Sequence, residues 1–270
     1  MMNRKMVLRS SISVGSKQEF IDEILSLAKY KVGSYVCFAN VHMVMESYNN
    51  PAFQEVVNHS NIVAPDGKPI SLFIRAFNHL IQDRICGMDL LPELLKRADS
   101  AGKSVYFYGG TIKVLEEIVQ KVHKEFPSLQ ISGSYSPPFR NLSKQEEDEI
   151  VTKIKSTSPD LVFVSLGCPK QEKWMAVHKD KLGACLLGVG QAFSTYAGVE
   201  KRLPVWMRNF SLEWIYRLYL EPKRLWKRYL FTNSHFLLLT LAHSVTQLRN
   251  RLNKSVNKAP LAINRSEIDE

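Results

Sequence analysis

The sequence lacks the short motifs that mark several common classes of enzyme and metalloprotein. It has four cysteines and no Cys-x-x-Cys pair, so it offers neither a paired zinc-ligand motif nor a redox dithiol. It contains no phosphate-binding P-loop, no Gly-x-Ser-x-Gly nucleophile motif and no Asp-x-Asp pair that could hold a divalent cation on a diphosphate. Its seven histidines are scattered without ligand spacing, so we expect no metal site.

Long apolar runs are also missing. The longest run near the C-terminus, residues 236–242, is far shorter than the roughly 20 residues that cross a bilayer. The N-terminus carries charged residues but no apolar core of a signal peptide after them. We therefore expect a chain that is soluble or lies on a membrane without crossing it. Widely separated cysteines fit thiols in a reducing cytosol.

Acidic residues are too few to balance the basic ones. The chain has 36 Lys and Arg against 26 Asp and Glu, a net charge of +10, which favours an anionic partner such as nucleic acid, a phosphorylated substrate or a membrane surface. Residues 201–228 hold eight basic and two acidic residues, with Trp and Tyr between them. This pattern suits a helix at the lipid headgroups, and it equally suits a helical pair packed on the domain by its aromatic face.

The apolar pattern predicts an α/β fold. Short continuous apolar runs alternate with helical segments, and such strands are typical of a mostly parallel sheet that is covered by helices on both faces. We predict a Rossmann-like domain over residues 1–198, a basic, aromatic-rich helical appendage over 199–254 and a disordered tail over 255–270. The expected strands are 5–14, 35–39, 62–64, 103–108, 129–133, 160–165 and 184–190.

Ligands of open parallel sheets bind beyond the carboxyl ends of the strands. The residues that the predicted strand ends offer there are Asn40, Asp66, Gly109, Gly110, Lys170, Gln171, Gly190 and Gln191. Asp66 stands on a tight turn between Pro65 and Gly67, where it can cap a helix or act as a general base.

The stretch after residue 165 is a candidate anion site. Pro169 suits the first position of a helix, because its missing N–H would have no partner there. Lys170, Gln171 and Glu172 would then lie in the first turn, near the positive end of the helix dipole, where a diphosphate can bind. An ordinary strand-to-helix turn with solvated polar residues has the same pattern.

Several motifs occur together in a fixed order over residues 35–230. They are Ala39-Asn40, Ala64-Pro-Asp-Gly67, Arg84-Ile-Cys-Gly-Met-Asp-Leu90, Tyr108-Gly-Gly110, Leu166-Gly-Cys-Pro-Lys-Gln-Glu-Lys-Trp174, Gly188-Val-Gly190, Lys201-Arg-Leu-Pro204, Leu212-Glu-Trp-Ile-Tyr-Arg-Leu218 and Glu221-Pro-Lys-Arg-Leu-Trp226. This set resembles the WecG/TagA/CpsF family of bacterial glycosyltransferases. Asn40-Val-His-Met43 and Ser136-Pro-Pro-Phe-Arg140 also resemble its GumM branch, which adds glucose to a lipid-linked sugar.

The resemblance implies an inverting transfer of glucose or a related hexose from a nucleotide diphosphate, usually UDP, to a sugar on a polyprenyl diphosphate. It implies exopolysaccharide or surface-glycan assembly at the cytoplasmic face of the inner membrane, with no metal or other cofactor. Family members often form homo-oligomers. Asp66 matches the proposed catalytic base, and without a metal, cations and backbone N–H groups must stabilise the departing diphosphate.

The resemblance also assigns residues to the pocket and the appendage. The pocket positions are Asn40, Arg84, Gly109, Gly110, Lys170, Gln171 and Gly190. Arg217, Arg224 and Lys227 match basic positions of the appendage, which in the family closes over the site and meets the membrane.

Two residues depart from the family pattern. Phe38 stands where Thr is frequent, and Ser194 stands where the family often has Asp, which suggests a different donor sugar. Two alternatives stay open: a non-catalytic nucleotide- or nucleic-acid-binding α/β protein, and a silent family member that serves as a scaffold. The aromatic-rich setting of the charge suits a membrane better than a duplex groove, so we expect no nucleic-acid partner.

Overall fold

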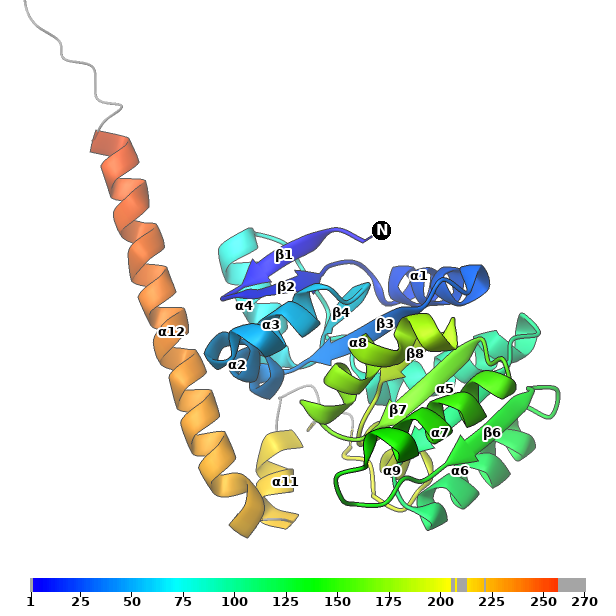
Figure 1. Ribbon diagram of the computed structural model, residues 1–270. Helices are drawn as coiled ribbons and strands as arrows, with labels where there is room; N and C mark the ends of the chain where they lie inside the picture. Colours follow the sequence, from blue (N-terminus) through cyan, green and yellow to red (C-terminus); the bar gives the residue numbers. More distant parts are fainter. Residues whose placement is uncertain (1, 205–206, 208–212, 221, 257–270) are drawn as a thin grey trace, which may run out of the picture.

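The computed structural model describes residues 2–204, 207, 213–220 and 222–256. Its centre is a six-stranded sheet in the order β4-β3-β8-β7-β5-β6, and every neighbouring pair is parallel. The strands are β3 (Ser34–Ala39), β4 (Ile62–Pro65), β5 (Val105–Gly109), β6 (Ile131–Tyr135), β7 (Leu161–Ser165) and β8 (Cys185–Gly188). The predicted parallel α/β sheet is confirmed (Figure 1).

Helices cover both faces of the sheet, which explains why its strands read as continuous apolar runs. One face carries α1 (Lys17–Tyr30), α5 (Gly87–Ser100), α6 (Ile112–Glu125) and α9 (Ala192–Tyr196). The other face carries α2 (Val41–Asn49), α3 (Pro51–Asn58), α4 (Lys68–Asn78), α7 (Lys144–Ser156) and α8 (Lys170–Leu182).

The strands divide their side chains between two hydrophobic cores. Phe107 and Phe163 enter the core beneath α5 and α6, whereas Tyr106, Tyr108 and Val162 enter the core beneath α7 and α8. All five are buried, as the two-residue period of a strand requires when both faces are covered. Helix starts follow local capping rules: Ser143 and Glu146 form the capping box that their spacing predicts.

The N-terminal prediction was wrong. Residues 5–14 do not form one strand; β1 (Arg4–Val7) and β2 (Ser10–Ser13) form an antiparallel hairpin separate from the main sheet. The chain reverses at Leu8, whose φ of 54° is left-handed although no glycine, asparagine or proline marks the turn. The hairpin packs beside β4, where Val63 N donates to Ser13 Oγ at 3.1 Å.

Beyond the α/β domain, the described residues include two helical stretches, in agreement with the predicted helical appendage. They are α11 (Glu213–Leu220) and α12 (Pro222–Val256), and α12 runs along the side of the domain and projects beyond it (Figure 1). Phe236 is buried, and His243 contacts the rings of Phe73 and Phe77 on α4 at 5.5 and 4.8 Å between centroids. No helix in the described ranges is both long and apolar enough to cross a membrane.

Candidate functional site

The connections of β5 and β7 select one position on the sheet. The two strands are neighbours, and the chain leaves β5 into α6 on one face but leaves β7 into α8 on the opposite face. Ligands of open α/β sheets bind at such a switch point, outside the carboxyl ends of the strands. All six strands end at this edge of the sheet because all are parallel, so each predicted strand-end residue lies along it.

The turn after β5 is built on two glycines. Gly109 has φ of 104°, and a Cβ added to it would lie 2.2 Å from the carbonyl oxygen of Ser165 at the end of β7. Gly110 N donates to that same oxygen at 3.0 Å, and Ser136 Oγ donates to Gly110 O at 2.6 Å. A side chain at position 109 would overlap the end of β7, so Gly109 is a structural requirement of the switch point.

The start of α8 differs from the expectation. The helix begins at Lys170, so Pro169 precedes it and does not occupy its first position. Lys170 is exposed, but Gln171 and Glu172 are buried. Of the three residues that were expected to meet an anion, the structure therefore exposes Lys170 alone.

The Gln171 side chain joins two turns of the strand edge. Its Oε1 accepts from Gly167 N at 3.2 Å, and its Nε2 donates to Gly188 O at 2.9 Å and to Glu172 Oε1 at 2.6 Å. Both hydrogens of the amide are thus donated inside the protein. The structure gives Gln171 the role of fixing the ends of β7 and β8 relative to each other.

Sequence reasoning placed Glu172 in the first turn of the helix near an anion but did not predict its burial. It is fully buried, and burial raises the pKa of its carboxyl from 4.5 to about 7, against the hydrogen bond from Gln171 that lowers it. Its Oε2 has no hydrogen-bond partner among the described residues. Helical spacing could have found it, because Glu172 lies three positions before the buried Met175 on the inner face of α8.

Asn40 and Asp66 lie side by side at the ends of β3 and β4. The register pairs Ala39 with Pro65, and Asp66 N donates to Ala39 O at 3.0 Å. Asn40 Oδ1 caps α2 by accepting from Met43 N at 3.1 Å. Asp66 does not take the N-cap position of α4, which belongs to Gly67. Both Asn40 and Asp66 are half-buried.

Arg84 belongs to an ion-pair cluster next to this strand end. Its guanidinium donates to Asp89 Oδ2 at 3.1 Å, and Asp89 Oδ1 accepts from Arg202. Cys86 Sγ donates to Asp89 Oδ2 at 2.8 Å. Burial opposes ionisation of Asp89, but the hydrogen bonds from Cys86 and Arg202 and the charges of both arginines lower its pKa overall. Asp89 and Arg202 stand in quoted motifs but were not predicted as site residues.

The cluster also reaches Asp66. Ile85 N donates to Pro65 O at 2.9 Å, which holds the Arg84 loop against the residue before Asp66. Burial raises the pKa of the Cys86 thiol, and the negative charge of Asp66 is the next cause. Asp66, Arg84 and Asp89 therefore share one electrostatic environment at the end of β4.

The turn after β8 leads into the C-terminal part of the chain. Gly190 has φ of 51°, and its carbonyl accepts from Ser165 Oγ at 2.9 Å. Gln191 Nε2 donates to Glu200 Oε2. Ser194 is half-buried, and its carbonyl accepts from Glu200 N at 3.0 Å. Phe38 is buried in the core, paired across the sheet with Ala64.

The three predicted cations of the appendage cannot be placed in the same way. Arg217 belongs to α11 and Arg224 and Lys227 belong to α12, and their side chains lie outside the described part of the structure. Among the residues that are described, no group of three or more His, Cys, Asp and Glu side chains is arranged to hold a metal ion.

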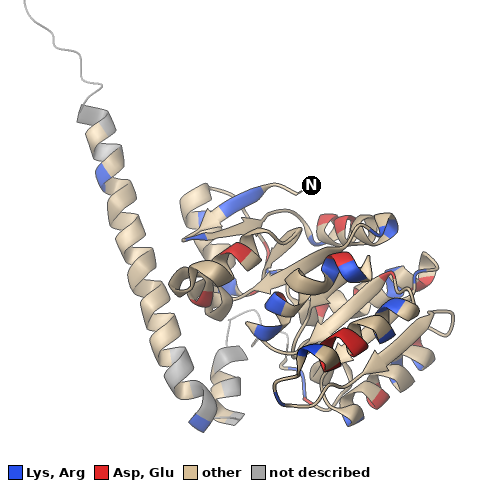
Figure 2. Ribbon diagram, in the orientation of Figure 1, with Lys and Arg blue, Asp and Glu red and all other residues tan. Residues whose placement is uncertain are grey.

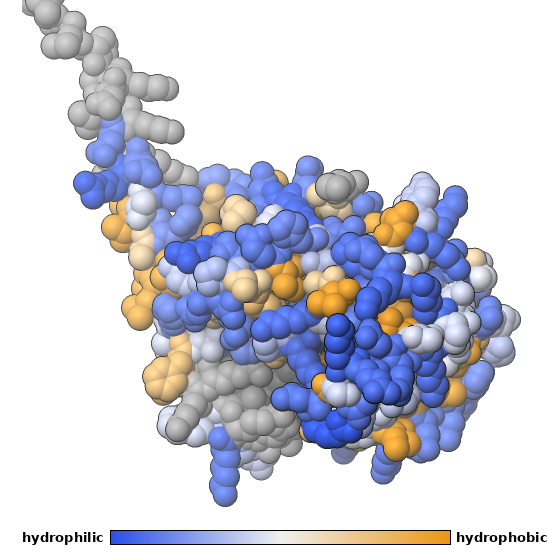
Figure 3. Space-filling view, viewed as in Figure 1, coloured by the Kyte–Doolittle hydropathy of each residue, from blue (hydrophilic) through white to orange (hydrophobic). Residues whose placement is uncertain are grey.

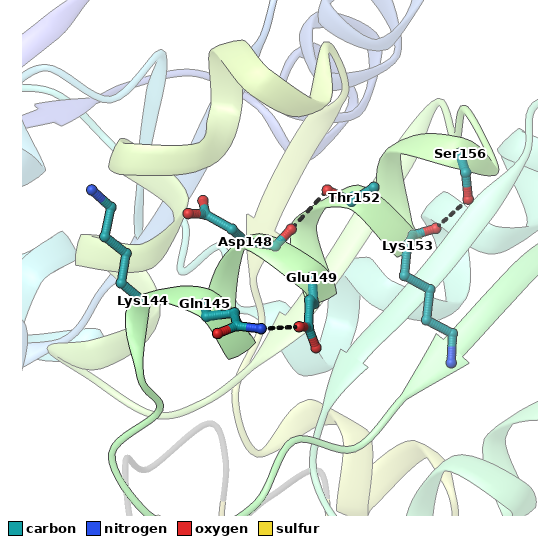
Figure 4. A pocket seen from close by; sticks show the side chains of 7 residues that line it. All are labelled: Lys144, Gln145, Asp148, Glu149, Thr152, Lys153 and Ser156. Atoms are coloured by element: carbon teal, nitrogen blue, oxygen red, sulfur yellow. Dashed lines mark hydrogen bonds between the residues drawn. The ribbon is translucent and has the colours of Figure 1, made fainter.

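A shallow hollow lies elsewhere, along the outer face of α7 (Figure 4). Its lining comes from successive turns of that one helix, including Gln145, Glu149 and Lys153. Gln145 Nε2 donates to Glu149 Oε1 at 3.0 Å, and Thr152 Oγ1 donates to the carbonyl of Asp148 at 2.8 Å. Hydrogen bonds within one helix do not make convergent ligand contacts, so we place the candidate site at the strand edge instead.

The predicted residues fall into two groups along that edge. Asn40, Asp66 and Arg84 lie at the ends of β3 and β4, and the glycine turns with Lys170 and Gln191 lie over β5, β7 and β8. Four strand spacings separate β4 from β5, or about 19 Å. A ligand that meets a base at one end and backbone turns at the other must be elongated, as a nucleotide diphosphate sugar is.

The chain is similar to one known family and to several named proteins over most of its length. The family model described as "Glycosyl transferase WecG/TagA/CpsF family" matches residues 5–250. A protein of Bacillus spizizenii named N-acetylglucosaminyldiphosphoundecaprenol N-acetyl-beta-D-mannosaminyltransferase is 34% identical over 199 residues, which cover 73% of this chain and 75% of the relative. A protein of the same name from Bacillus subtilis is 34% identical over 201 residues, covering 74% and 76%. Another from Staphylococcus aureus is 29% identical over 192 residues, covering 71% and 74%.

Proposed function

The chain belongs to the WecG/TagA/CpsF family of glycosyltransferases, and on that premise we propose that it transfers a hexose from a UDP-sugar to a sugar carried on a polyprenyl diphosphate. Family membership makes it an enzyme that transfers a glycosyl group, and it counts against the non-catalytic nucleic-acid-binding alternative. The names of the relatives describe transfer of N-acetylmannosamine to N-acetylglucosaminyldiphosphoundecaprenol. Those names support the lipid-linked class of acceptor.

The observation that carries the mechanism is the half-buried carboxylate of Asp66 at the end of β4, beside the Arg84 loop. In the proposed step, Asp66 takes the proton of an acceptor hydroxyl while that oxygen attacks the anomeric carbon. The bond from that carbon to the diphosphate oxygen breaks, and attack from the opposite side inverts the configuration.

The leaving nucleoside diphosphate must be stabilised as its charge develops. We assign this role to Arg84, to the exposed Lys170 and to backbone N–H groups at the glycine turns, together with Arg217, Arg224 and Lys227 of the appendage. In this proposal cations stabilise the charge of the leaving diphosphate, which a divalent metal stabilises in other glycosyltransferases. Turnover of the purified enzyme should therefore survive EDTA.

The donor sugar is the finer part of the proposal. The motifs over 40–43 and 136–140 favour glucose or a related hexose in exopolysaccharide assembly, whereas the relatives are named for N-acetylmannosamine. A thermal-shift panel of UDP-glucose, UDP-N-acetylmannosamine, and GDP- and TDP-sugars separates them, because a ligand that binds only the folded state raises the melting temperature.

We further propose that the enzyme acts at the cytoplasmic face of the inner membrane as a peripheral protein, and that it can form homo-oligomers. The support is chemical: α12 carries no acidic residue and has basic residues toward both ends, with a middle that holds no charged residue (Figure 2). Anionic lipid would attract such a helix.

Replacement of Asp66 by Asn tests the mechanism. Loss of a general base lowers kcat by about 10²- to 10⁴-fold, while the melting temperature should stay within a few degrees of the wild type. Asp83→Asn, an exposed acid on the same loop as Arg84, is the matched control and should keep full turnover. Normal activity of the Asp66 variant would reject the base, and a wild-type protein without any transfer would favour the scaffold alternative.

A further inference from the structure

The carboxylate of Asp89 joins two arginines that come from distant parts of the chain. Oδ2 accepts from Arg84 at 3.1 Å, and Oδ1 accepts from Arg202, which lies 113 positions later. The three side chains are 16%, 30% and 34% exposed for Arg84, Asp89 and Arg202, so water screens these ion pairs only in part.

Arg202 belongs to the segment by which the chain leaves the α/β domain, residues 198–204, called here the exit segment. A second contact ties this segment to the strand edge, because the Glu200 side chain accepts from Gln191 and its N–H donates to Ser194 O at 3.0 Å. The exit segment thus touches the turn after β8 and the start of α5 together.

We propose that Asp89 is a positioning residue that orients Arg84 toward the diphosphate. Arg202 acts through Asp89, so that the orientation of Arg84 depends on the contact between the exit segment and the α/β domain. The proposal rests on the proposed function, in which Arg84 contacts the diphosphate of the donor. Neither Asp89 nor Arg202 needs to touch substrate for this role.

The contacts within the cluster support positioning roles for Asp89 and Arg202. One carboxylate accepts from both guanidinium groups, one at each of its oxygens, so Asp89 orients both cations at once. Arg84 has a long side chain with many rotamers, and a fixed partner keeps it near the end of β4. Arg202 holds the Oδ1 side of the carboxylate, so its loss should weaken the contact between Asp89 and Arg84, although Cys86 still donates to Oδ2.

The test measures UDP affinity by calorimetry and donor kinetics in the full-length protein, for Asp89→Asn, Arg202→Gln and the double variant. We expect Asp89→Asn to raise the Kd for UDP and the donor KM by about tenfold or more, with a smaller change in kcat, because Arg84 contacts the diphosphate before and during transfer. Arg202→Gln should raise the Kd for UDP and the donor KM by roughly threefold to tenfold. The double variant should match Asp89→Asn alone, since Arg202 acts only through that carboxylate.

Arg97→Gln is the matched control. Arg97 also lies on α5 and forms an Arg–Asp pair, with Asp22 at 3.0 Å, away from the strand ends. It should leave Kd, KM and kcat as in the wild type. Asp89→Glu, which keeps the charge, should recover part of the lost affinity, which a purely structural role would not predict.

Three results would overturn the proposal. If Arg202→Gln behaves like Arg97→Gln, the exit segment is not coupled to Arg84. If the effects of Arg202→Gln and Asp89→Asn multiply in the double variant, Arg202 contacts the donor itself. If Asp89→Asn does not fold, the Arg202 variant alone still decides, because its side chain is partly exposed. A wild-type protein that binds no UDP would reject the proposed function as well, so the two failures are distinguishable.

Discussion

At the scale of single residues, the most unusual group is the carboxyl of Glu172. It is buried behind the strand edge, next to the Gln171 amide that holds the ends of β7 and β8. A buried carboxyl is easier to protonate, and its pKa of about 7 lies well above the ordinary 4.5. The protonation state of Glu172 therefore changes near neutral pH.

The pH dependence of stability tests this assignment. Between pH 4.5 and about 7 the unfolded state loses the Glu172 proton while the folded state keeps it, so the free energy of unfolding should fall as pH rises and level off above 7. At about 1.36 kcal/mol per pKa unit, the total fall is roughly 3 kcal/mol.

Glu172→Gln removes this titration, so urea unfolding should show it to be the more stable protein at pH 8 but not at pH 4.5. Glu116→Gln, an exposed acid on α6, is the control and should follow the wild type. A wild-type stability that stays flat from pH 5 to 8 would contradict the raised pKa.

Residue placement was predictable where it depended on strand ends alone. Asn40, Asp66 and the glycines lie on the sheet edge because parallel strands bring their carboxyl ends together. Gln171 was predicted to face a ligand but is buried, since the prediction counted positions from Pro169 and did not ask which face of α8 packs on the sheet. The Asp89–Arg202 pair joins residues 113 positions apart, and no local pattern reveals such a contact.

At the scale of elements, the conformation of the turn between β5 and α6 is restricted by its close contact with the end of β7. Gly109 combines a left-handed φ of 104° with a Cβ position only 2.2 Å from Ser165 O. Gly102, on the turn before β5, has φ of 59° but nothing within 4 Å of its Cβ position. Both glycines have a positive φ, but only Gly109 lacks space for a Cβ. Alanine substitutions at the two positions therefore separate conformational strain from steric overlap.

Gly109→Ala should therefore destabilise the fold far more than Gly102→Ala. Strain at a positive φ costs about 1 kcal/mol, and a backbone clash adds about 1–3 kcal/mol more. For a chain of this size, differential scanning calorimetry should show a loss of roughly 4–16 °C for Gly109→Ala against 2–4 °C for Gly102→Ala. Equal losses at the two positions would mean that β5 and β7 can move apart.

The order of strands and helices could be predicted from the sequence over most of the domain, because apolar runs and helix-capping residues indicate the same boundaries there. The capping box at Ser143 and the strand over 160–165 are examples of this agreement. The N-terminal hairpin was not readable, since Leu8 turns the chain without a turn residue and because tertiary contacts with β4 hold it there. The sheet order, with β8 beside β3, rests on long-range pairing that periodicity does not encode.

At the scale of the whole molecule, α12 has two faces with different surroundings. His235, Phe236 and His243 lie against the domain, where their rings contact those of Tyr48, Phe73 and Phe77. Nearly opposite on the helix is an apolar stripe made of Leu230, Leu237, Leu241, Val245 and Leu248, which are 54–67% exposed (Figure 3). With basic residues near both ends of the helix, this stripe suits the surface of an anionic membrane.

Replacing Leu237, Leu241 and Val245 by Ser in the full-length protein tests that surface. None of the three is buried, so the melting temperature should hardly change. Removing about 1.5–3 kcal/mol of apolar transfer energy per side chain should lower cosedimentation with phosphatidylglycerol vesicles by at least tenfold.

Val177→Ser, an exposed apolar residue on α8, is the control and should sediment like the wild type. Wild-type binding should weaken with added salt and on neutral phosphatidylcholine, because screening acts on the basic residues. If the triple variant still binds vesicles but changes from dimer to monomer in analytical ultracentrifugation without lipid, the stripe pairs with a second copy of the chain and the membrane assignment fails. The stripe can be buried in only one of these two ways at a time, so the two measurements together decide what covers α12.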